Sequence, residues 1–323
     1  MNCIRMNCIR LLLPGLLLVL SPIAAAQNYP DKPIRVLVPF AAGSGTDILA
    51  RIVTDEMRAA MGANFVIDNR AGASGQIAAE LAAKANPDGY TLFLSTNTPH
   101  SANPFLFKKL NYDPVRDFAA VSRMIYYVFI LVVNPNAGIR TVPELIAYVK
   151  ANPGKTSYAF GNSTGQVNGA YFTIAAKLDA LPVPYKSTPP AMTDLIAGQV
   201  HYMFVDAASS QGHVKSGRLR AIAVMSDKRS AVMPELPAVG ETVPGFDTVP
   251  WAGMFVPAGT PTAVINRLNR EIVNAINKPA INQRLAESGL QPGPSTPAEL
   301  DRFVKEQLAA WGKKIKEAGI QPE

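Results

Sequence analysis

The sequence has little cysteine, histidine or charge. Its two cysteines, Cys3 and Cys8, lie in an N-terminal segment that we expect to be removed, and charged residues make up only 17% of the chain. The remaining protein would therefore have no disulfide, no thiol nucleophile and no thiolate metal site. Three histidines are present, His100, His201 and His213, and no two of them have the spacing of metal ligands. We expect no metal and no cofactor.

Long apolar runs are also missing, except at the N-terminus. There, Arg5 and Arg10 precede "LLLPGLLLVL", and the small residues 24–26 follow. This pattern is typical of a signal peptide. We expect residues 1–26 to be cleaved near Ala26, so that an exported protein begins at Gln27. The run is too short and too broken by Pro and Gly to predict a membrane span.

The charge balance is mildly basic and has no strong concentration. The full chain has 31 Lys and Arg against 24 Asp and Glu, a net charge of +7. Loss of Arg5 and Arg10 with the signal peptide leaves 29 against 24, or +5. The basic residues are scattered, so we expect no nucleic-acid partner. About 297 residues would remain, which is enough for two domains with real cores.

Short β-branched or aromatic runs alternate with helical patterns, which predicts α/β sheets of parallel type, or mixed sheets, flanked by helices. Two helix starts have clear capping residues, Thr141 with Glu144 and Thr296 with Glu299. Nine runs are expected to be strands: "IRVLVPF", "NFVIDN", "TLFLST", "VFILVVN", "SYAF", "PVPYK", "VHYMFVD", "LRAIAVM" and "WAGMFVP".

Two segments are candidates for crossings between lobes. The run "SRMIYYVFILVVNP" follows a first βαβαβ block, and "VPGFDTVPWAGMFVP" precedes a helical C-terminal region. We therefore expect residues 27–125 and 249–323 to form one lobe and residues 126–248 the other. Hinges would lie near 124–128 and 246–251, with a ligand cleft between the lobes.

The loop "PFAAGSGTDILAR" follows the first predicted strand and opens a helix. It places Gly43, Ser44, Gly45, Thr46 and Asp47 at the helix N-terminus, where free amides and the helix dipole favour an anion. It fits neither the dinucleotide-binding pattern nor a P-loop. An alternative is that Ser44 and Asp47 only cap the helix.

Two further loops of small polar residues follow strands. One contains Ser95, Thr96 and Asn97, and the other is "GNSTG", residues 161–165, ahead of a helix. Ligands of open α/β sheets bind at the carboxyl ends of strands, so loops from both lobes could close on one small molecule.

The segment "GNSTG" also fits G-x-S-x-G, the turn that carries the nucleophile of a serine hydrolase. Asp206 and His213 follow Ser163 in the order that such a triad requires. They are only seven residues apart, whereas that fold takes its acid and histidine from different strands. A segment resembling an HGGG oxyanion hole is also missing. We expect a protein that is not an enzyme, and keep a hydrolase using Ser163 as an alternative.

Several blocks resemble the Bug family of periplasmic solute receptors, the binding subunits of tripartite tricarboxylate transporters. The resemblance runs from Tyr29 to the C-terminus. It rests on "YPDKPIRVLVPFAAGSGTDILAR", "VIDNRAGASGQIAAELAAKANPDGYTLFLST", "LNYDPVRDFAAVS", "VPYKSTPPAMTDLIAGQV", "GRLRAIAV", "RSAVMPELPAVGE" and "FVPAGTP".

That resemblance implies a two-lobed, Venus-flytrap periplasmic receptor that delivers a small carboxylate to membrane permease subunits, and we expect it to be a monomer. A membrane sensor that uses the same binding chemistry is an alternative partner. Family members usually have Pro-Gly-Gly where this chain has residues 42–44, and Tyr-Lys-Gly where it has residues 185–187, so the ligand stays open between mono- and dicarboxylic acids, including aromatic ones. The expected ligand-binding residues are Phe40, Gly43, Ser44, Gly45, Thr46, Asp47, Ser95, Thr96, Asn97, Gly161, Asn162, Ser163, Thr164, Gly165, Tyr185 and Asp206.

Neither residues 43–47 nor residues 161–165 include Arg or Lys, so helix N-termini are expected to neutralise the ligand. Lys186 is the nearest competing cation. The rings of Phe40, Tyr126, Tyr127 and Trp251 lie next to the expected cleft segments in the sequence, and an alternative is that they belong to the core.

Overall fold

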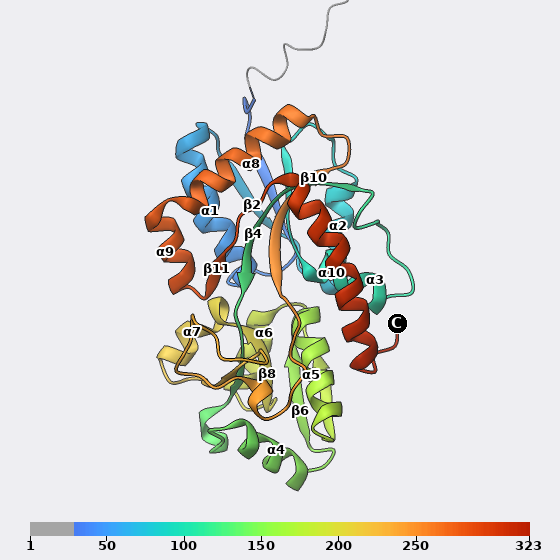
Figure 1. Ribbon diagram of the computed structural model, residues 1–323, viewed down its shortest axis with the longest axis vertical. Helices are drawn as coiled ribbons and strands as arrows, with labels where there is room; N and C mark the ends of the chain where they lie inside the picture. The colour runs from blue at the N-terminus through green and yellow to red at the C-terminus, as the bar shows by residue number, and fades with distance from the viewer. Residues whose placement is uncertain (1–28) are drawn as a thin grey trace, which may run out of the picture.

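The computed structural model describes residues 29–323, which form two lobes stacked along the long axis of the molecule (Figure 1). The predicted signal peptide lies outside the described residues. Each lobe has one β-sheet with helices packed on it, so the two-lobed α/β fold is confirmed. Among the helices of residues 29–323, none combines the length and apolar character needed to cross a membrane.

The first lobe contains a six-stranded sheet with the order β11-β4-β10-β3-β1-β2. Its strands are β1 (Ile34–Val38), β2 (Phe65–Asn69), β3 (Thr91–Thr96), β4 (Phe118–Tyr127), β10 (Trp251–Pro257) and β11 (Leu290–Pro292). Its helices are α1 (Gly45–Met61), α2 (Gln76–Ala83), α3 (Asn103–Leu106), α8 (Thr262–Asn277), α9 (Pro279–Glu287) and α10 (Pro297–Glu317).

The second lobe contains a five-stranded sheet with the order β7-β6-β8-β5-β9. Its strands are β5 (Phe129–Val133), β6 (Thr156–Phe160), β7 (Ala180–Pro184), β8 (Tyr202–Asp206) and β9 (Arg220–Val224). Its helices are α4 (Val142–Ala151), α5 (Ser163–Ala175), α6 (Thr188–Ile196) and α7 (Ala207–Lys215).

Both sheets are covered on two sides, which explains why their central strands are almost wholly apolar. In β1, Val36 and Val38 pack with residues of α1 and α8, whereas Leu37 between them packs with α2 and α10 on the other face. Side chains alternate across a strand, so a strand buried on both faces must be apolar at every position. Each lobe thus has two apolar layers that hold the strand ends in place.

Both sheets are mixed, and two of their antiparallel strands, β5 and β10, have a common cause. β5 runs antiparallel to β8 and β9, and β10 runs antiparallel to β3 and β4. Each of these two strands is the first after the chain passes from one lobe to the other, so it starts at the lobe boundary and runs away from it. β3, β6 and β8 instead end at that boundary, which brings their following loops together there.

The two connections between the lobes lie side by side. Only Val128 separates β4 in one sheet from β5 in the other, and the backbone N–H of Tyr127 donates to Pro250 O at 2.9 Å, just before β10. The expected boundary after residue 125 falls inside β4. That strand continues to Tyr127 because its end pairs with β11, a strand that the sequence did not predict.

Helix α10 belongs to the first lobe but reaches the second (Figure 1). Its Trp311 and Ile315 pack in one apolar cluster with Leu106 of α3 and Val167 of α5. The buried Lys314 donates to Gly245 O at 2.7 Å in the return connection. The helix begins at the predicted cap, where Thr296 and Glu299 form a capping box. Thr141 caps α4 by accepting from Glu144 N, but the Glu144 carboxylate accepts from Arg140 N, so the reciprocal bond of a capping box is missing there. These two predicted helix starts are confirmed.

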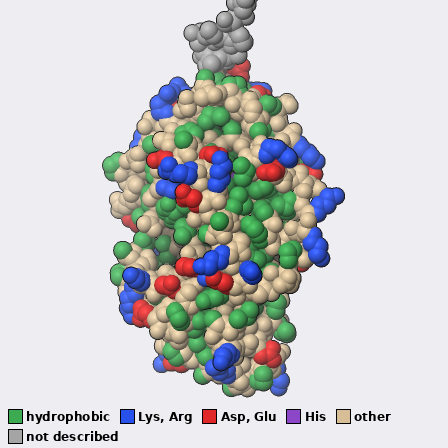
Figure 2. Space-filling view, turned by 45° about the vertical axis from the view of Figure 1, so that its right-hand side comes forward, with side chains coloured by type: hydrophobic (Ala, Val, Ile, Leu, Met, Phe, Trp, Pro, Cys, Tyr) green, Lys and Arg blue, Asp and Glu red, His purple; other side chains and the backbone are tan. Residues whose placement is uncertain are grey.

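The face shown in Figure 2 has Lys and Arg interspersed with Asp and Glu. No continuous area of one sign covers that face. This face therefore offers a polyanion no extended basic surface.

Candidate ligand-binding site

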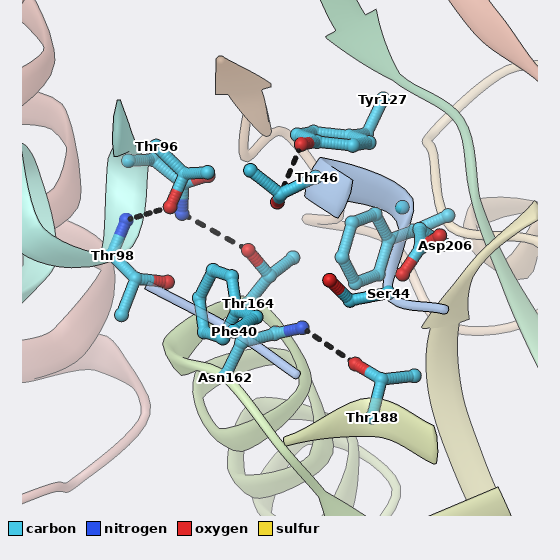
Figure 3. Close-up of a pocket in the computed structure, with 13 residues that line it drawn as sticks. Phe40, Ser44, Thr46, Thr96, Thr98, Tyr127, Asn162, Thr164, Thr188 and Asp206 are labelled. Atoms are coloured by element: carbon cyan, nitrogen blue, oxygen red, sulfur yellow. Dashed lines mark hydrogen bonds between the residues drawn. The ribbon is translucent and has the colours of Figure 1, made fainter. Parts of the chain in front are cut away.

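A cavity lies between the lobes, where the loops after several strands meet (Figure 3). The room inside it is only about 20 Å³, enough for roughly one water molecule, so a ligand needs the walls to move apart. No Lys, Arg or His is among its lining residues, which are Phe40, Ser44, Gly45, Thr46, Thr96, Asn97, Thr98, Tyr127, Phe129, Asn162, Thr164, Thr188 and Asp206.

The N-terminus of α1 forms one wall of the cavity. Ser44 precedes the helix in an extended conformation, and its hydroxyl accepts from Asp47 N at 3.3 Å. The amides of Gly45 and Thr46 have no acceptor within the helix, because that acceptor would have to precede the first turn. Gly43, with a φ of 80°, makes the tight turn that leads into this helix. The wall therefore presents N–H donors to a ligand.

The N-terminus of α5 forms part of the opposite wall. Asn162 is the N-cap, and its side-chain oxygen accepts from Gly165 N at 2.9 Å. Ser163 N donates to Thr98 Oγ1 at 3.3 Å. The remaining first-turn amide belongs to Thr164, which lines the cavity. Two helix N-termini, one from each lobe, thus border the same small space and favour a bound anion.

Neutral hydrogen bonds join the lobes around the cavity. Asn97 Nδ2 donates to Thr164 Oγ1 at 3.0 Å, and the hydroxyls of Thr98 and Ser163 are 2.8 Å apart. Ala41 N donates to Ser187 Oγ at 3.1 Å. Ser187 stands where the resembled family usually has Gly, so this hydroxyl is a feature of the present chain. The lobes are therefore in direct contact around the cavity.

Aromatic rings complete the cavity. Phe40, Tyr127 and Phe129 line it, and the hydroxyls of Tyr127 and Thr46 are 2.8 Å apart, as the dashed line in Figure 3 marks. Burial raises the pKa of Tyr127 well above its ordinary value, so the phenol stays neutral at physiological pH. These rings offer a ligand an apolar surface and add no charge.

Two aspartates were predicted in the site, and they have different surroundings. Asp47 is buried beneath α1, where Arg51, Asn69 and the Gly43 amide all donate to its carboxylate. Burial alone would raise the pKa of Asp47, but these hydrogen bonds together hold it below its ordinary value. Asp47 does not line the cavity. It stabilises the loop that precedes α1.

Asp206 ends β8 and lines the cavity with only 5% of its surface exposed. Its Oδ1 accepts from Ser209 N at 2.8 Å, which caps α7. Burial raises the pKa of the Asp206 carboxyl, and the hydrogen bonds from Ser209 offset only part of the rise. The first turn of α1 comes so close that a Cβ on Gly45 would lie 2.3 Å from Oδ1.

The structure brings part of the predicted set to the cavity. The predicted residues that line it are Phe40, Ser44, Gly45, Thr46, Thr96, Asn97, Asn162, Thr164 and Asp206. Those that do not are Gly43, Asp47, Ser95, Gly161, Ser163, Gly165 and Tyr185. Gly161 packs against the backbone of Ser187 and Thr188, and the Tyr185 hydroxyl donates to Asp194 at 2.6 Å.

Four lining residues were missing from the predicted set, Thr98, Tyr127, Phe129 and Thr188. Thr188 is the first residue of α6, and Thr98 opens the turn after β3, so both occupy strand-to-helix loops like those that were recognised. Attention to every hydroxyl in such loops would have found them. Tyr127 and Phe129 lie in a continuous apolar run, where the sequence does not separate cleft side chains from core side chains. Trp251 is fully buried, and Lys186 is exposed and does not line the cavity.

Ser163 has no hydrogen bond to a histidine in the described part of the chain, and this includes His213 of the alternative triad. Its hydroxyl is fully buried and is paired with Thr98, and the hydrogen bonds of His100 and His201 go to Ser95 and Ser157 instead. His100 is enclosed by aromatic rings, and burial lowers its pKa to about 3. Residues 29–323 contain no group of three or more His, Cys, Asp or Glu that could hold a metal ion.

Comparison with known proteins agrees with this geometry. The family described as "Tripartite tricarboxylate transporter family receptor" matches residues 49–320. The chain belongs to this receptor family. It is 33% identical to the protein BugT of Bordetella pertussis over 324 residues, which cover 98% of this chain and 99% of BugT.

Solved structures of similar receptors cover nearly the whole described chain. Rpa4515 of R. palustris with adipate is 32% identical and superposes with a TM-score of 0.89, covering 91% of this chain and 100% of that one. MatC of Rhodopseudomonas palustris with bound malate is 29% identical, with a TM-score of 0.83 and coverage of 89% and 100%. The periplasmic binding protein BugD is 32% identical, with a TM-score of 0.87 and coverage of 91% and 100%.

Proposed function

We propose that this receptor captures a small carboxylate between its lobes and delivers it to the membrane subunits of a tripartite tricarboxylate-type transporter. The observation that carries the proposal is the meeting of two helix N-termini at one small cavity whose lining has no basic side chain. A carboxylate accepts hydrogen bonds from such amides and is favoured by both helix dipoles, each worth about 0.3–2 kcal/mol.

The similar receptors support the choice of ligand class. Rpa4515 is described with adipate and MatC with malate, and both ligands are dicarboxylates. The lining of this cavity is neutral except for Asp206, so a carboxylate of this chain's ligand would be held by backbone amides, the hydroxyls of Thr46 and Thr164, and ordered water.

Titration calorimetry with a panel of acids tests the ligand class. The panel includes citrate, succinate, glutamate, aspartate, nicotinate and terephthalate, with neutral sugars and amines as controls. We expect at least one acid to bind. At a free concentration of a hundred times its Kd, it should also raise the free energy of unfolding by about 2.7 kcal/mol. Binding only by a sugar or an amine would contradict the proposal.

Lobe closure is a second consequence. A ligand that touches both walls stabilises the closed form only by its difference in affinity for the two forms. We expect bending near residues 124–128 and 246–251, and X-ray scattering should record compaction when the acid is added. An unchanged radius of gyration with a bound acid would contradict closure by the ligand.

The partner and compartment can be tested in cells. We propose that the protein is exported to the periplasm, is cleaved near Ala26 and acts as a monomer. Mass spectrometry of the periplasmic fraction should find a chain beginning at Gln27, and loss of the gene should abolish uptake of the acid. If uptake continues and the loaded protein instead binds a membrane sensor, the receptor serves signalling.

A further inference from the structure

Asp206 is the one ionisable acid in the lining of the cavity, and it has no cationic partner in residues 29–323. Its carboxylate is 95% buried, and its hydrogen bonds with protein donors come from Ser209 in the first turn of α7. In Figure 3 it lies on one side of the cavity, and Thr96 and Thr98 lie on the other. The cavity therefore has a neutral, hydroxyl-rich side and an acidic side.

An ionised carboxylate that is removed from water is unfavourable unless a charge or several donors compensate it. Asp206 has partial compensation from the N-termini of α7, which it caps, and of α1, whose Gly45 touches it. None of the α1 amides forms a hydrogen bond with the carboxylate, however. The cost of burying the charge therefore exceeds this compensation, and the Asp206 carboxylate can still accept further hydrogen bonds.

The two sides belong to one cavity. Because Asp206, Thr96 and Thr98 all line it, a ligand that enters between the lobes and spans the cavity meets both sides. A dicarboxylate would bring a second negative group towards Asp206, and two carboxylates can share such a site only if one takes up a proton. A protonated amine would instead neutralise Asp206 and donate to its free lone pairs.

We propose that Asp206 binds a protonated amine of the ligand, so that the receptor selects a small amino acid or similar zwitterion over the corresponding dicarboxylate. This inference rests on the proposed function, which supplies the carboxylate end of the ligand. It adds a second recognition group on the opposite wall and assigns it to one side chain.

Matched ligands test the inference with the chain from Gln27 onwards. Calorimetry at pH 7.5 compares each amino acid with analogues in which hydrogen or hydroxyl replaces the amine: alanine with propionate and lactate, aspartate with succinate and malate, glutamate with glutarate. We expect at least one amino acid to bind at least about tenfold more tightly than its analogues, as a charge-assisted hydrogen bond predicts.

The variant Asp206→Asn removes the charge and keeps the helix cap, since Asn is as good an N-cap as Asp. It should abolish the preference for the amine. The matched control is Asp179→Asn, an exposed aspartate outside the cavity, which should leave all affinities unchanged. Circular dichroism and melting curves establish that both variants are folded.

The outcomes separate this inference from the proposed function. If succinate or glutarate binds more tightly than the matching amino acid, or if Asp206→Asn retains the preference for the amine, the amine subsite is wrong and the carboxylate receptor stands. Tighter dicarboxylate binding at pH 5 than at pH 8 would instead make Asp206 a proton donor to the ligand, which also overturns the amine subsite. If no acid binds, both proposals fail.

Discussion

Each lobe buries one aspartate beside the cleft, and the two side chains differ in their partners. Asp47, in the first lobe, is 3% exposed and accepts hydrogen bonds from Arg51, Asn69 and Gly43 N. Asp206, in the second lobe, is 5% exposed and accepts from the first turn of its own helix. The pKa of Asp47 is lowered by its partners and that of Asp206 is raised by burial.

The difference separates a structural acid from a recognition acid. Asp47 uses its carboxylate to hold the loop ahead of α1, so its charge is satisfied before any ligand arrives. Asp206 keeps part of its charge uncompensated next to the space that a ligand would fill. Similar burial and a similar position at a helix N-terminus therefore do not imply a similar role. The role of each aspartate depends on its hydrogen-bond and charge partners.

We expect the largest effect from Gly45→Ala, which would introduce a steric clash with Asp206 where the lobes are in contact. The added Cβ would lie 2.3 Å from Asp206 Oδ1. Overpacking of this kind costs about 1–3 kcal/mol, so ligand affinity should fall by about 5–150-fold in calorimetry.

The control for this change is Gly212→Ala in α7, where a Cβ meets nothing within 4 Å. It should leave affinity unchanged and stabilise the helix slightly. Equal affinities for Gly45→Ala and the unmodified protein would mean that the ligand is not held where the lobes are in contact.

Asp47→Asn should destabilise the protein without a direct effect on the ligand. The change removes charge-assisted hydrogen bonds from Arg51, whose side chain is 53% exposed, so we expect a loss of about 1–2 kcal/mol in urea denaturation. Asp55→Asn, at a solvent-exposed pair with Arg58, is the control and should cost less than about 0.5 kcal/mol. Equal losses in the free energy of unfolding for the two variants would show that Asp47 stabilises the fold no more than an exposed aspartate does.

Asp206→Asn should stabilise the protein, in contrast to Asp47→Asn, and raise the melting temperature of the ligand-free protein at pH 7.5. Folding raises the pKa of the Asp206 carboxyl, so the folded state binds more protons than the unfolded state between the two pKa values. The free energy of unfolding of the unmodified protein therefore falls as the pH rises from the unfolded pKa to the folded pKa. The gain from Asn should therefore shrink towards pH 4, near the ordinary pKa of an unfolded Asp of about 3.9. A variant that is less stable at pH 7.5 would mean that Asp206 is compensated after all.

Ser163→Ala should have the smallest effect. Its hydroxyl pairs only with Thr98, which also accepts from Ser163 N at 3.3 Å and so retains a partner in the variant. Affinity should fall by less than about tenfold, in line with about 0.5–1.5 kcal/mol for one neutral hydrogen bond. Esterase activity that disappears with Ser163→Ala would instead favour a nucleophile.

The elements that the sequence predicted best are those whose sequence patterns lie within a few adjacent residues. The nine expected strands are present, and the capped starts at Thr141 and Thr296 are confirmed, because apolar runs and caps are properties of adjacent residues. Two strands were not among the nine. The end of β4 (Phe118–Tyr127) lies in the run that was interpreted as a single crossing between the lobes, and β11 (Leu290–Pro292) was missed because three residues have no measurable period and the strand exists only through its pairing with β4.

The site was predictable to the extent that it uses loops after strands. The loops that follow β1, β3 and β6 were recognised from their small polar residues, and the structure places parts of all three at one cavity. Which side chains face that cavity depends on packing between lobes. Ser95, for example, turns to His100 in the core, whereas Thr96 next to it lines the cavity. Among residues 29–323 no cationic side chain pairs with Asp206, and this too depends on three-dimensional neighbours that the sequence does not reveal.

The apolar cluster beneath α10 gives the protein its own optical reporter. The protein has two tryptophans, Trp251 and Trp311, which are 0% and 1% exposed. Only Trp311 belongs to this cluster, where it packs with Val167 of the second lobe while its helix belongs to the first. Separation of the lobes would expose the Trp311 indole to water, whereas Trp251 sits within the sheet of the first lobe. Emission should therefore shift to longer wavelength on opening and return on closure, so lobe motion can be followed without a label.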